Sequence, residues 1–186
     1  MIKSTKLLSI FVLLVTVGLL GSSCELAKYT GGGTIPGATS GKANFGFNIN
    51  GCKDPATSNI TFHDKADGVK LKGWVTEAAT CPTLDSLCGK CAYIYHEVCD
   101  DVKGSGFSFI GAAKVAYTSK NPKEPDTFDD IEDQEAILCI SDRGEGANDP
   151  PDFAAIYIKS GPFEDYANCG EVSGNVQMHE CPEEED

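Results

Sequence analysis

The sequence predicts an all-β domain: an antiparallel β-barrel or β-sandwich of about seven or eight strands with a cysteine-rich insertion. Three observations predict it. Short runs of alternating apolar and polar residues recur between turn signals made of Gly, Asn and Asp. No window combines helical periodicity with capping residues. Glycines fall inside several runs, as they do where a sheet bends sharply.

The predicted strands, in chain order, are residues 43–49, 59–63, 69–75, 107–117, 136–140, 153–158 and 172–178. Asp67-Gly68 separates the second run from the third and is a strong signal for a hairpin turn. Gly46, Gly73 and Gly111 predict bulges or bends within their strands. The best helical candidate is the short segment 83–87.

The first 24 residues resemble an export signal. Lys3 and Lys6 begin it, an unbroken apolar stretch fills residues 7–20, and small residues precede Cys24. A membrane-spanning helix needs about 20 apolar residues, so a cleaved signal over residues 1–23 fits better than a permanent span. Gly21-Ser22-Ser23-Cys24 resembles the lipobox of bacterial lipoproteins, although Gly21 stands where that pattern has an aliphatic residue. Lipid attachment at Cys24 and simple secretion therefore stay open, and both predict a cell-envelope or secreted protein.

The net charge of the chain limits the classes of molecule that it can bind. Acidic residues outnumber basic ones by 28 to 15, which gives a net charge of −13. Such a surface repels phosphate backbones, so the composition argues against nucleic-acid binding. It also repels anionic lipid, so we expect membrane contact through an N-terminal lipid only. A protein or glycan ligand stays unidentified at this stage.

Composition divides the mature chain into regions. Residues 24–41 are rich in Gly, Ser and Thr and read as a flexible tether. Residues 42–181 form the predicted β-domain, with insertions at 78–104 and 121–135. Residues 182–186 form an acidic tail.

Four motifs, spread in order over residues 31–179, carry a resemblance. They are Gly31-Gly32-Gly33-Thr34-Ile35-Pro36 with Lys42-Ala43-Asn44-Phe45-Gly46-Phe47; His63-Asp64 before Gly68-Val69-Lys70-Leu71-Lys72-Gly73; Asp142-Arg143-Gly144-Glu145-Gly146 before Asp152-Phe153; and Gly174-Asn175-Val176-Gln177-Met178-His179. In these motifs the chain resembles a family of small exported bacterial β-domains with no assigned activity. Arg143, the lengthened loop at residues 148–151 and the cysteine insertion depart from the family pattern. The resemblance implies a fold and a location rather than a reaction.

The cysteines predict disulfide bonds. If Cys24 carries lipid, an even number remains, which in an oxidising compartment implies up to four disulfides. The disulfide candidates are Cys52, Cys81, Cys88, Cys91, Cys99, Cys139, Cys169 and Cys181. Local pairs within the insertion and pairs back to the β-domain are equally allowed. A zinc site or a redox pair at the Cys88–Cys91 motif are the alternatives.

Residues 142–152 form a loop that concentrates carboxylates between glycines. Its candidate calcium ligands are Asp142, Glu145, Asp149 and Asp152. Calcium takes six to eight oxygen ligands from flexible loops, but the spacing here is not that of an EF-hand. The alternative is an acidic turn whose side chains bond nearby backbone. The sequence requires no cofactor, and calcium is the candidate that this loop suggests.

His63, Asp64 and His179 form a second candidate cluster. If the first hairpin and the last strand are neighbours in a closed barrel, these residues could hold a metal or supply a general base. A structural hydrogen bond is the alternative. No nucleophile elbow, zinc-protease motif or phosphate loop is present in the sequence. We therefore expect no enzymatic activity, with a metal-dependent hydrolase as the alternative.

Trp74, Tyr93 and Tyr95 could form an aromatic platform for a ligand, although core or cross-strand packing is the more common role of such residues. Taken together, the sequence predicts an exported, disulfide-stabilised β-domain with a binding or envelope-structural role. A calcium-dependent adhesion or carbohydrate-binding module using the 142–152 loop is the alternative.

Overall fold

The structure is a computed structural model that describes residues 27–52, 57–80, 86–94, 99, 111–119, 134–144, 149 and 151–182. Several predictions fall outside these residues: the signal peptide, Cys24, Cys81, Tyr95, Glu145, most of the 121–135 insertion, and the acidic tail beyond Pro182.

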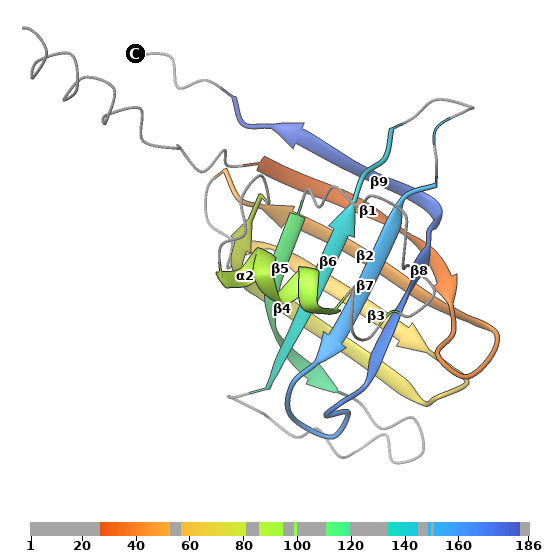
Figure 1. The fold of residues 1–186 in the computed structure, drawn as a ribbon. Coiled ribbons are helices and arrows are strands. Elements are labelled where there is room, and N and C mark those ends of the chain that lie inside the picture. The colour runs from red at the N-terminus through yellow and green to blue at the C-terminus, as the bar shows by residue number, and fades with distance from the viewer. Residues whose placement is uncertain are drawn as a thin grey trace, which may run out of the picture.

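The described chain is all-β with one short helix, as Figure 1 shows. The strands are β1 (Ala27–Pro36), β2 (Lys42–Asn50), β3 (Asn59–Asp64), β4 (Val69–Ala79), β5 (Gly111–Ser119), β6 (Glu135–Ser141), β7 (Phe153–Ile158), β8 (Ala167–Glu171) and β9 (Ser173–Glu180). The helix is α2 (Ser86–Tyr93). All strands pair antiparallel in one sheet of order β8-β7-β6-β5-β4-β3-β2-β1-β9, which curls into a nearly closed barrel.

The predicted fold class is confirmed, with two strands more than the seven alternating runs in the sequence. The hairpin at Asp67-Gly68 is also present, and Gly68 takes a positive φ of 71°. The helix begins three residues later than predicted and continues through the Cys88–Cys91 motif. The predicted bulges at Gly46, Gly73 and Gly111 are wrong: the register shift lies between Val75 and Glu77.

The predicted tether over residues 24–41 is wrong for residues 27–36. That segment is β1, an inner strand paired with β2 on one side and β9 on the other. Its glycines allow the backbone of β1 to lie very close to the neighbouring strands; they do not make the segment flexible. A Cβ on Gly31 would lie 2.5 Å from the Asn175 carbonyl oxygen, and one on Gly33 would lie 2.6 Å from that of Ser173. Both distances are shorter than side-chain carbons tolerate, so only glycine fits here.

β8 and β9 together close the barrel. They run in the same direction and are separated by Val172 alone, so they form one strand with a break. The first half pairs with β7 and the second half pairs with β1. Where the two halves meet, Gly170 lies against Pro36 at the end of β1. The seam of the barrel therefore runs along the open side of β9.

Inward-facing side chains fill the barrel. Strict alternation in β2 and β3 buries every second residue, including Phe45, Phe47 and Ile60. Tyr29 and Tyr117, which are 1% and 0% exposed, occupy the interior from β1 and β5. Burial of apolar surface of this kind is the main source of stability in a domain of this size.

A second, separate apolar cluster lies outside the barrel wall. Helix α2 packs on β5 and β6, as seen in Figure 1. Cys88, Cys91 and Ile94 of this segment contact outward side chains of β6 and β7, such as Ile137 and Phe153. The cysteine-rich insertion thus covers the outer face of β5–β8. Among the described residues, no helix is long and apolar enough to cross a membrane.

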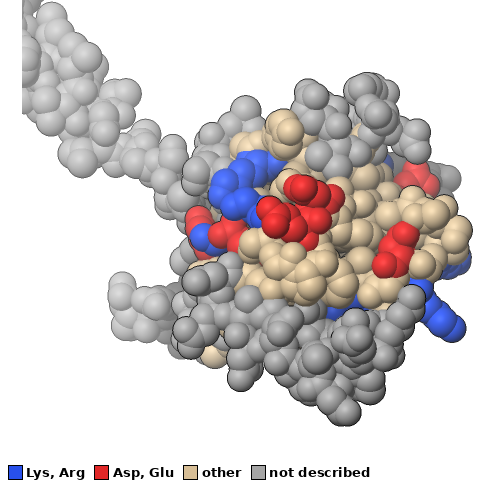
Figure 2. Space-filling view, turned by 90° about the horizontal axis from the view of Figure 1, so that it is seen from below, with Lys and Arg blue, Asp and Glu red and all other residues tan. Residues whose placement is uncertain are grey.

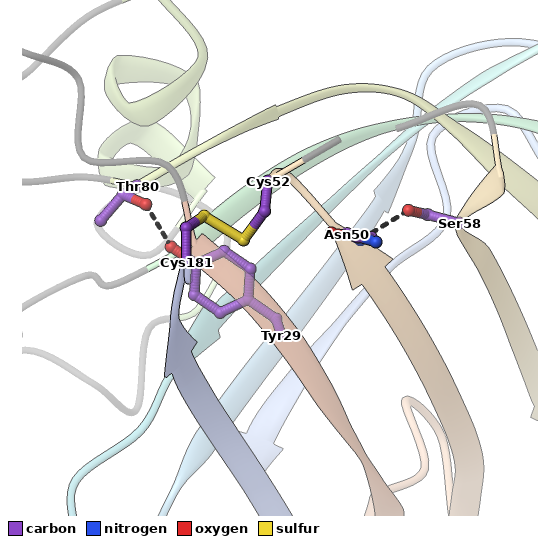
Figure 3. The surroundings of a disulfide bond; sticks show 6 residues. All are labelled: Tyr29, Asn50, Cys52, Ser58, Thr80 and Cys181. Carbon is purple, nitrogen blue, oxygen red and sulfur yellow. Dashed lines mark hydrogen bonds between the residues drawn. A yellow bond between two sulfur atoms is a disulfide. The ribbon is translucent and has the colours of Figure 1, made fainter. Parts of the chain in front are cut away.

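One end of the barrel holds the start of β1 and the end of β9, and we call it the terminal end. Here Cys52, just after β2, is bonded to Cys181, just after β9 (Figure 3). Beside this disulfide the Tyr29 hydroxyl lies 2.6 Å from Thr80 Oγ1. The backbone N–H of Asn50 donates a hydrogen bond to Ser58 Oγ across the β2–β3 connection. These contacts fix the termini to the barrel.

Candidate binding site on the outer face

The outer face of β2–β5 carries polar side chains in three cross-strand rows. The alternation that buries the apolar residues turns these side chains to solvent. From β2 towards β5 the rows are Asn44, His63 and Lys70; then Gly46, Thr61, Lys72 and Thr118; then Asn48, Asn59, Trp74 and Ala116. Residues directly opposite one another in such rows lie close enough for one ligand to touch several of them.

A groove of about 440 Å³ follows the first two rows. Gly46, at the β2 end of the second row, lines it and has no side chain to fill the space. The nearest atom to a Cβ placed on Gly46 would be Thr61 Oγ1 at 3.6 Å, so the space above it is open. Side chains of Asn44, His63, Lys70 and Lys72 line its sides. The groove is thus a shallow depression with polar walls.

The lysines of the groove differ from Lys114 and Lys159 in their surroundings. Lys114 and Lys159 both form ion pairs with Glu135, and their hydrogen bonds lower the pKa of that carboxyl although burial alone raises it. On the face seen in Figure 2, acidic and basic side chains likewise lie next to one another. Lys70 and Lys72 have no ion pair with any described carboxylate, and no acidic residue lines the groove. The groove is therefore locally positive in an acidic protein.

Trp74 lies beside the groove in the third row. It is the only tryptophan of the chain and is 41% exposed, although the apolar side chains of Leu71 and Val75 on the same strand are buried. Its row neighbours, Asn59 and Ala116, leave its ring accessible from outside. Tyr93, 61% exposed, lies on α2, over the part of the wall that the insertion covers. Of the two described members of the predicted aromatic platform, Trp74 flanks the groove and Tyr93 does not.

The structure does not bring His63, Asp64 and His179 together. His63 faces out on β3, and its neighbour Asp64 faces the interior. His179 lies on β9, where its Nε2 is 2.9 Å from Thr30 Oγ1. Through the register, His63 is level with Thr34 of β1 and His179 with Lys28, about 20 Å along the strand direction. The predicted cluster does not exist, because the two histidines lie at opposite ends of the barrel.

Asp64 instead holds three connections together at the end of the barrel away from the termini. It is 0% exposed. Its Oδ2 accepts hydrogen bonds from the Ala38 amide at 3.0 Å and the Tyr166 hydroxyl at 2.9 Å, and its Oδ1 accepts one from the Ala66 amide at 3.1 Å. Burial raises the pKa of this carboxyl, but the hydrogen bonds outweigh it and lower the pKa overall. Asp64 is therefore a buried structural anion.

The acidic loop also contributes structural hydrogen bonds. Asp152 Oδ2 accepts from the Val176 amide and Asp142 Oδ2 from the Met178 amide, at 2.9 and 3.0 Å. Their other oxygens accept from the backbone amides of Arg143 and Gly144. The two carboxylates thus replace a neighbouring strand along the open edge of β9. This arrangement matches the predicted alternative, in which the loop side chains bond backbone.

The calcium prediction remains a prediction. All four carboxylate oxygens of Asp142 and Asp152 already accept backbone hydrogen bonds. Asp149 is exposed and lies close to Gly144. Within the described residues, no three or more His, Cys, Asp or Glu side chains are grouped to hold a metal ion.

The cysteines pair back to the barrel. Cys91 of α2 is bonded to Cys139 of β6, and Cys99 to Cys169 of β8. Cys88 is also in a disulfide bond. Cys91 and Cys99 therefore follow one of the two arrangements that the spacing allows, the pairing back to the β-domain, and Cys91 does not pair with Cys88 as in a redox motif. Cys91 and Cys99 fasten their part of the insertion to the wall.

Comparisons with protein-family models, with curated proteins and with solved structures found no match for this chain. The candidate site therefore rests on the geometry of the barrel. Sequence reasoning singled out His63 and Trp74 but not the groove between them. Alternation in β2–β4 shows which side chains face outward, yet it does not show which part of the wall the insertion leaves open.

Proposed function

We propose that this protein is an exported binding domain, anchored through a lipid on Cys24, that holds its ligand in the groove on the outer face of β2–β5. Its disulfides support export, because such bonds persist in oxidising compartments. The proposal assigns the domain recognition of a ligand rather than a chemical reaction.

The observation that carries the proposal is the unequal covering of the barrel wall. Side chains fill the interior, so the described barrel uses its inside as a core. The insertion covers the outer face of β5–β8 and is fastened there by Cys91–Cys139 and Cys99–Cys169. The outer face of β2–β4 keeps an exposed tryptophan and a groove. Concave surfaces with an aromatic side chain and a few polar groups are where ligands bind.

The groove chemistry supports binding. Asn44, Thr61 and Thr118 offer amide and hydroxyl groups, and Lys70 and Lys72 offer ammonium groups. His63 adds an imidazole that can donate or accept a hydrogen bond. These groups suit hydrogen bonding to a polar ligand.

Intact-mass spectrometry of the protein from its native membrane, with and without reduction, tests export and anchoring. We expect a chain that begins at Cys24 with attached acyl chains and gains mass on reduction. A Cys24→Ser variant should leave the membrane fraction and keep its disulfides. A native chain that still begins at Met1 with reduced thiols contradicts the proposal.

The fluorescence of Trp74 tests the groove, because the chain has no other tryptophan to mask its signal. A Gly46→Val variant adds a side chain to the open floor of the groove, where the structure has room for it. We expect ligands that change Trp74 emission in the oxidised wild-type protein to lose affinity at least tenfold in this variant. Equal affinity in both proteins places binding elsewhere on the domain.

A further inference from the structure

We infer that the ligand of the groove is an acidic glycan, a chain of sugars that carry carboxylate groups. The inference rests on the proposed binding function and adds the chemical class of the ligand. It follows from three features of the same surface: an exposed aromatic ring, a set of neutral hydrogen-bonding side chains, and two lysines without acidic partners.

The aromatic ring and the neutral side chains favour a sugar. A sugar ring has an apolar face and a rim of hydroxyl groups. Trp74 offers a flat apolar surface for that face. Asn48 and Asn59 lie exposed in the same row as Trp74, and Asn44 lies exposed in the first row. Each amide can donate and accept at once. A flat apolar contact flanked by such groups complements a sugar ring on both counts.

The lysines select an acidic sugar. Lys70 and Lys72 lie on the same face of β4 two residues apart, which spaces their Cα atoms by about 6.8 Å along the strand. His63 stands directly opposite Lys70, and Thr118 opposite Lys72. The charges therefore form a line across which an extended chain can place successive carboxylates. Charge-assisted hydrogen bonds of this kind are stronger than neutral ones.

The overall charge of the protein limits the size of this attraction. A net charge of −13 repels a long polyanion at a distance, but salt screens such repulsion beyond about 8 Å. The local positive charge then acts only on groups that have entered the groove. This arrangement favours short, hydroxyl-rich chains with spaced carboxylates over densely charged polymers.

Titration of the oxidised, full-length mature protein with tetragalacturonate, followed by Trp74 fluorescence and calorimetry, tests the inference. We expect binding that weakens at least tenfold when the carboxylates are methyl-esterified, since esterification keeps the sugar and removes the charge. The double variant Lys70→Gln/Lys72→Gln should lose affinity for the acid form by at least tenfold and leave the ester unchanged. Gly46→Val should weaken both.

Lys28→Gln is the matched control, because Lys28 lies on β1, about 20 Å along the strand direction from the first row of the groove. It should bind like the wild type. Equal affinity for the acid and the ester overturns the acidic selection. Binding that the Lys70/Lys72 variant keeps overturns the assigned groove. Failure to bind either sugar overturns the inference. The proposed function is tested separately. It fails if mass spectrometry finds a chain that was not exported, or if Gly46→Val leaves ligand affinity unchanged.

Discussion

A single carboxylate, Asp64, organises the end of the barrel opposite the termini. It joins the β1–β2 turn, its own hairpin and the start of β8, through Ala38, Ala66 and Tyr166. Phe62 packs against the Tyr166 ring with centroids 5.8 Å apart, so the network continues into the core. Burial, and then its own hydrogen bond to Asp64, raise the pKa of the Tyr166 hydroxyl. A buried charge is tolerated only when its hydrogen bonds are satisfied, and here they are.

Replacing Asp64 tests this role. We expect Asp64→Asn to lower the free energy of unfolding by about 3 kcal/mol at neutral pH, because an amide cannot accept all of these hydrogen bonds. Urea unfolding measures it. Asp67→Asn, in the exposed turn next to it, is the control and should cost less. Similar losses in both variants argue against a special role for the buried carboxylate.

The same variant should show a defined pH dependence. The folded-state pKa of Asp64 is lowered, so its contribution is present above the unfolded pKa of about 3.9 and is lost as the pH falls through the folded value. The difference in stability between wild type and Asp64→Asn should therefore shrink below about pH 4. Unfolding midpoints measured between pH 3 and pH 7 check it; a constant difference contradicts it.

Two glycines of neighbouring strands make a matched pair. Gly33→Ala in β1 puts a Cβ 2.6 Å from the Ser173 carbonyl oxygen and 2.8 Å from Gly174 Cα, and neither atom can move without the strand. We expect a loss of at least about 2 kcal/mol in unfolding free energy. Gly46→Ala meets nothing closer than 3.6 Å and should change stability by less than about 1 kcal/mol. Thermal melts of both variants give the comparison, and equal melting temperatures exclude close packing at Gly33.

At the scale of elements, the seam along β9 depends on two side chains instead of a strand. Edge strands expose amides that invite pairing with other chains. Asp142 and Asp152 occupy the amides of Met178 and Val176, and the Asp152 carbonyl accepts from Val172. Arg143 between them lies over the Phe153 ring, 5.6 Å from its centre. The loop therefore caps β9 in place of a tenth strand.

The carboxylates of Asp142 and Asp152 should contribute differently to the free energy of unfolding. The Asp152–Val176 bond is buried and the Asp142–Met178 bond is exposed. We expect Asp152→Asn to cost about 2 kcal/mol and Asp142→Asn about 1 kcal/mol or less, because water replaces an exposed hydrogen bond more easily. Hydrogen exchange at the amides of Val176 and Met178 should rise in the corresponding variant. Unchanged exchange in both would mean that the seam is held by other contacts.

At the scale of the whole molecule, the disulfides stabilise two different regions. Cys52–Cys181 spans 129 residues and ties the terminal end of the barrel, whereas Cys91–Cys139 spans 48 and fastens α2. The apolar cluster under α2 is separate from the barrel core. We infer that the insertion can loosen without opening the barrel.

Removing one disulfide at a time tests this division. The Cys91→Ala/Cys139→Ala variant should raise hydrogen exchange in α2 and leave β2–β4 protected. The Cys52→Ala/Cys181→Ala variant should lower the unfolding free energy of the whole domain by about 2–4 kcal/mol. Hydrogen exchange with mass spectrometry separates the two responses. Uniform loss of protection in the first variant contradicts the division.

The sequence predicted those parts of the fold that depend on local patterns. Alternation marked β2, β3 and β4, and a continuous apolar run marked β7 over its full length. It missed β1, because glycine signals flexibility as readily as close packing, and β8, whose sequence Ala-Asn-Cys-Gly-Glu has no alternating apolar residues. Asp64 has hydrogen-bond partners 26 and 104 residues away, and Asp152 has a partner across the seam, Val176. No local sequence pattern reveals such partners. For the same reason the groove could not be foreseen.

The short distance between Cys24 and β1 also fixes how the domain stands on a lipid surface. Only Glu25 and Leu26 lie between Cys24 and Ala27, and each residue spans at most about 3.6 Å. Ala27 is paired with Glu180, so the terminal end would rest against the bilayer with almost no stalk. Lys70 and His63 belong to the far end, level with Thr34. If Cys24 carries a lipid, the first row of the groove would therefore lie on the side of the barrel at the end away from the membrane.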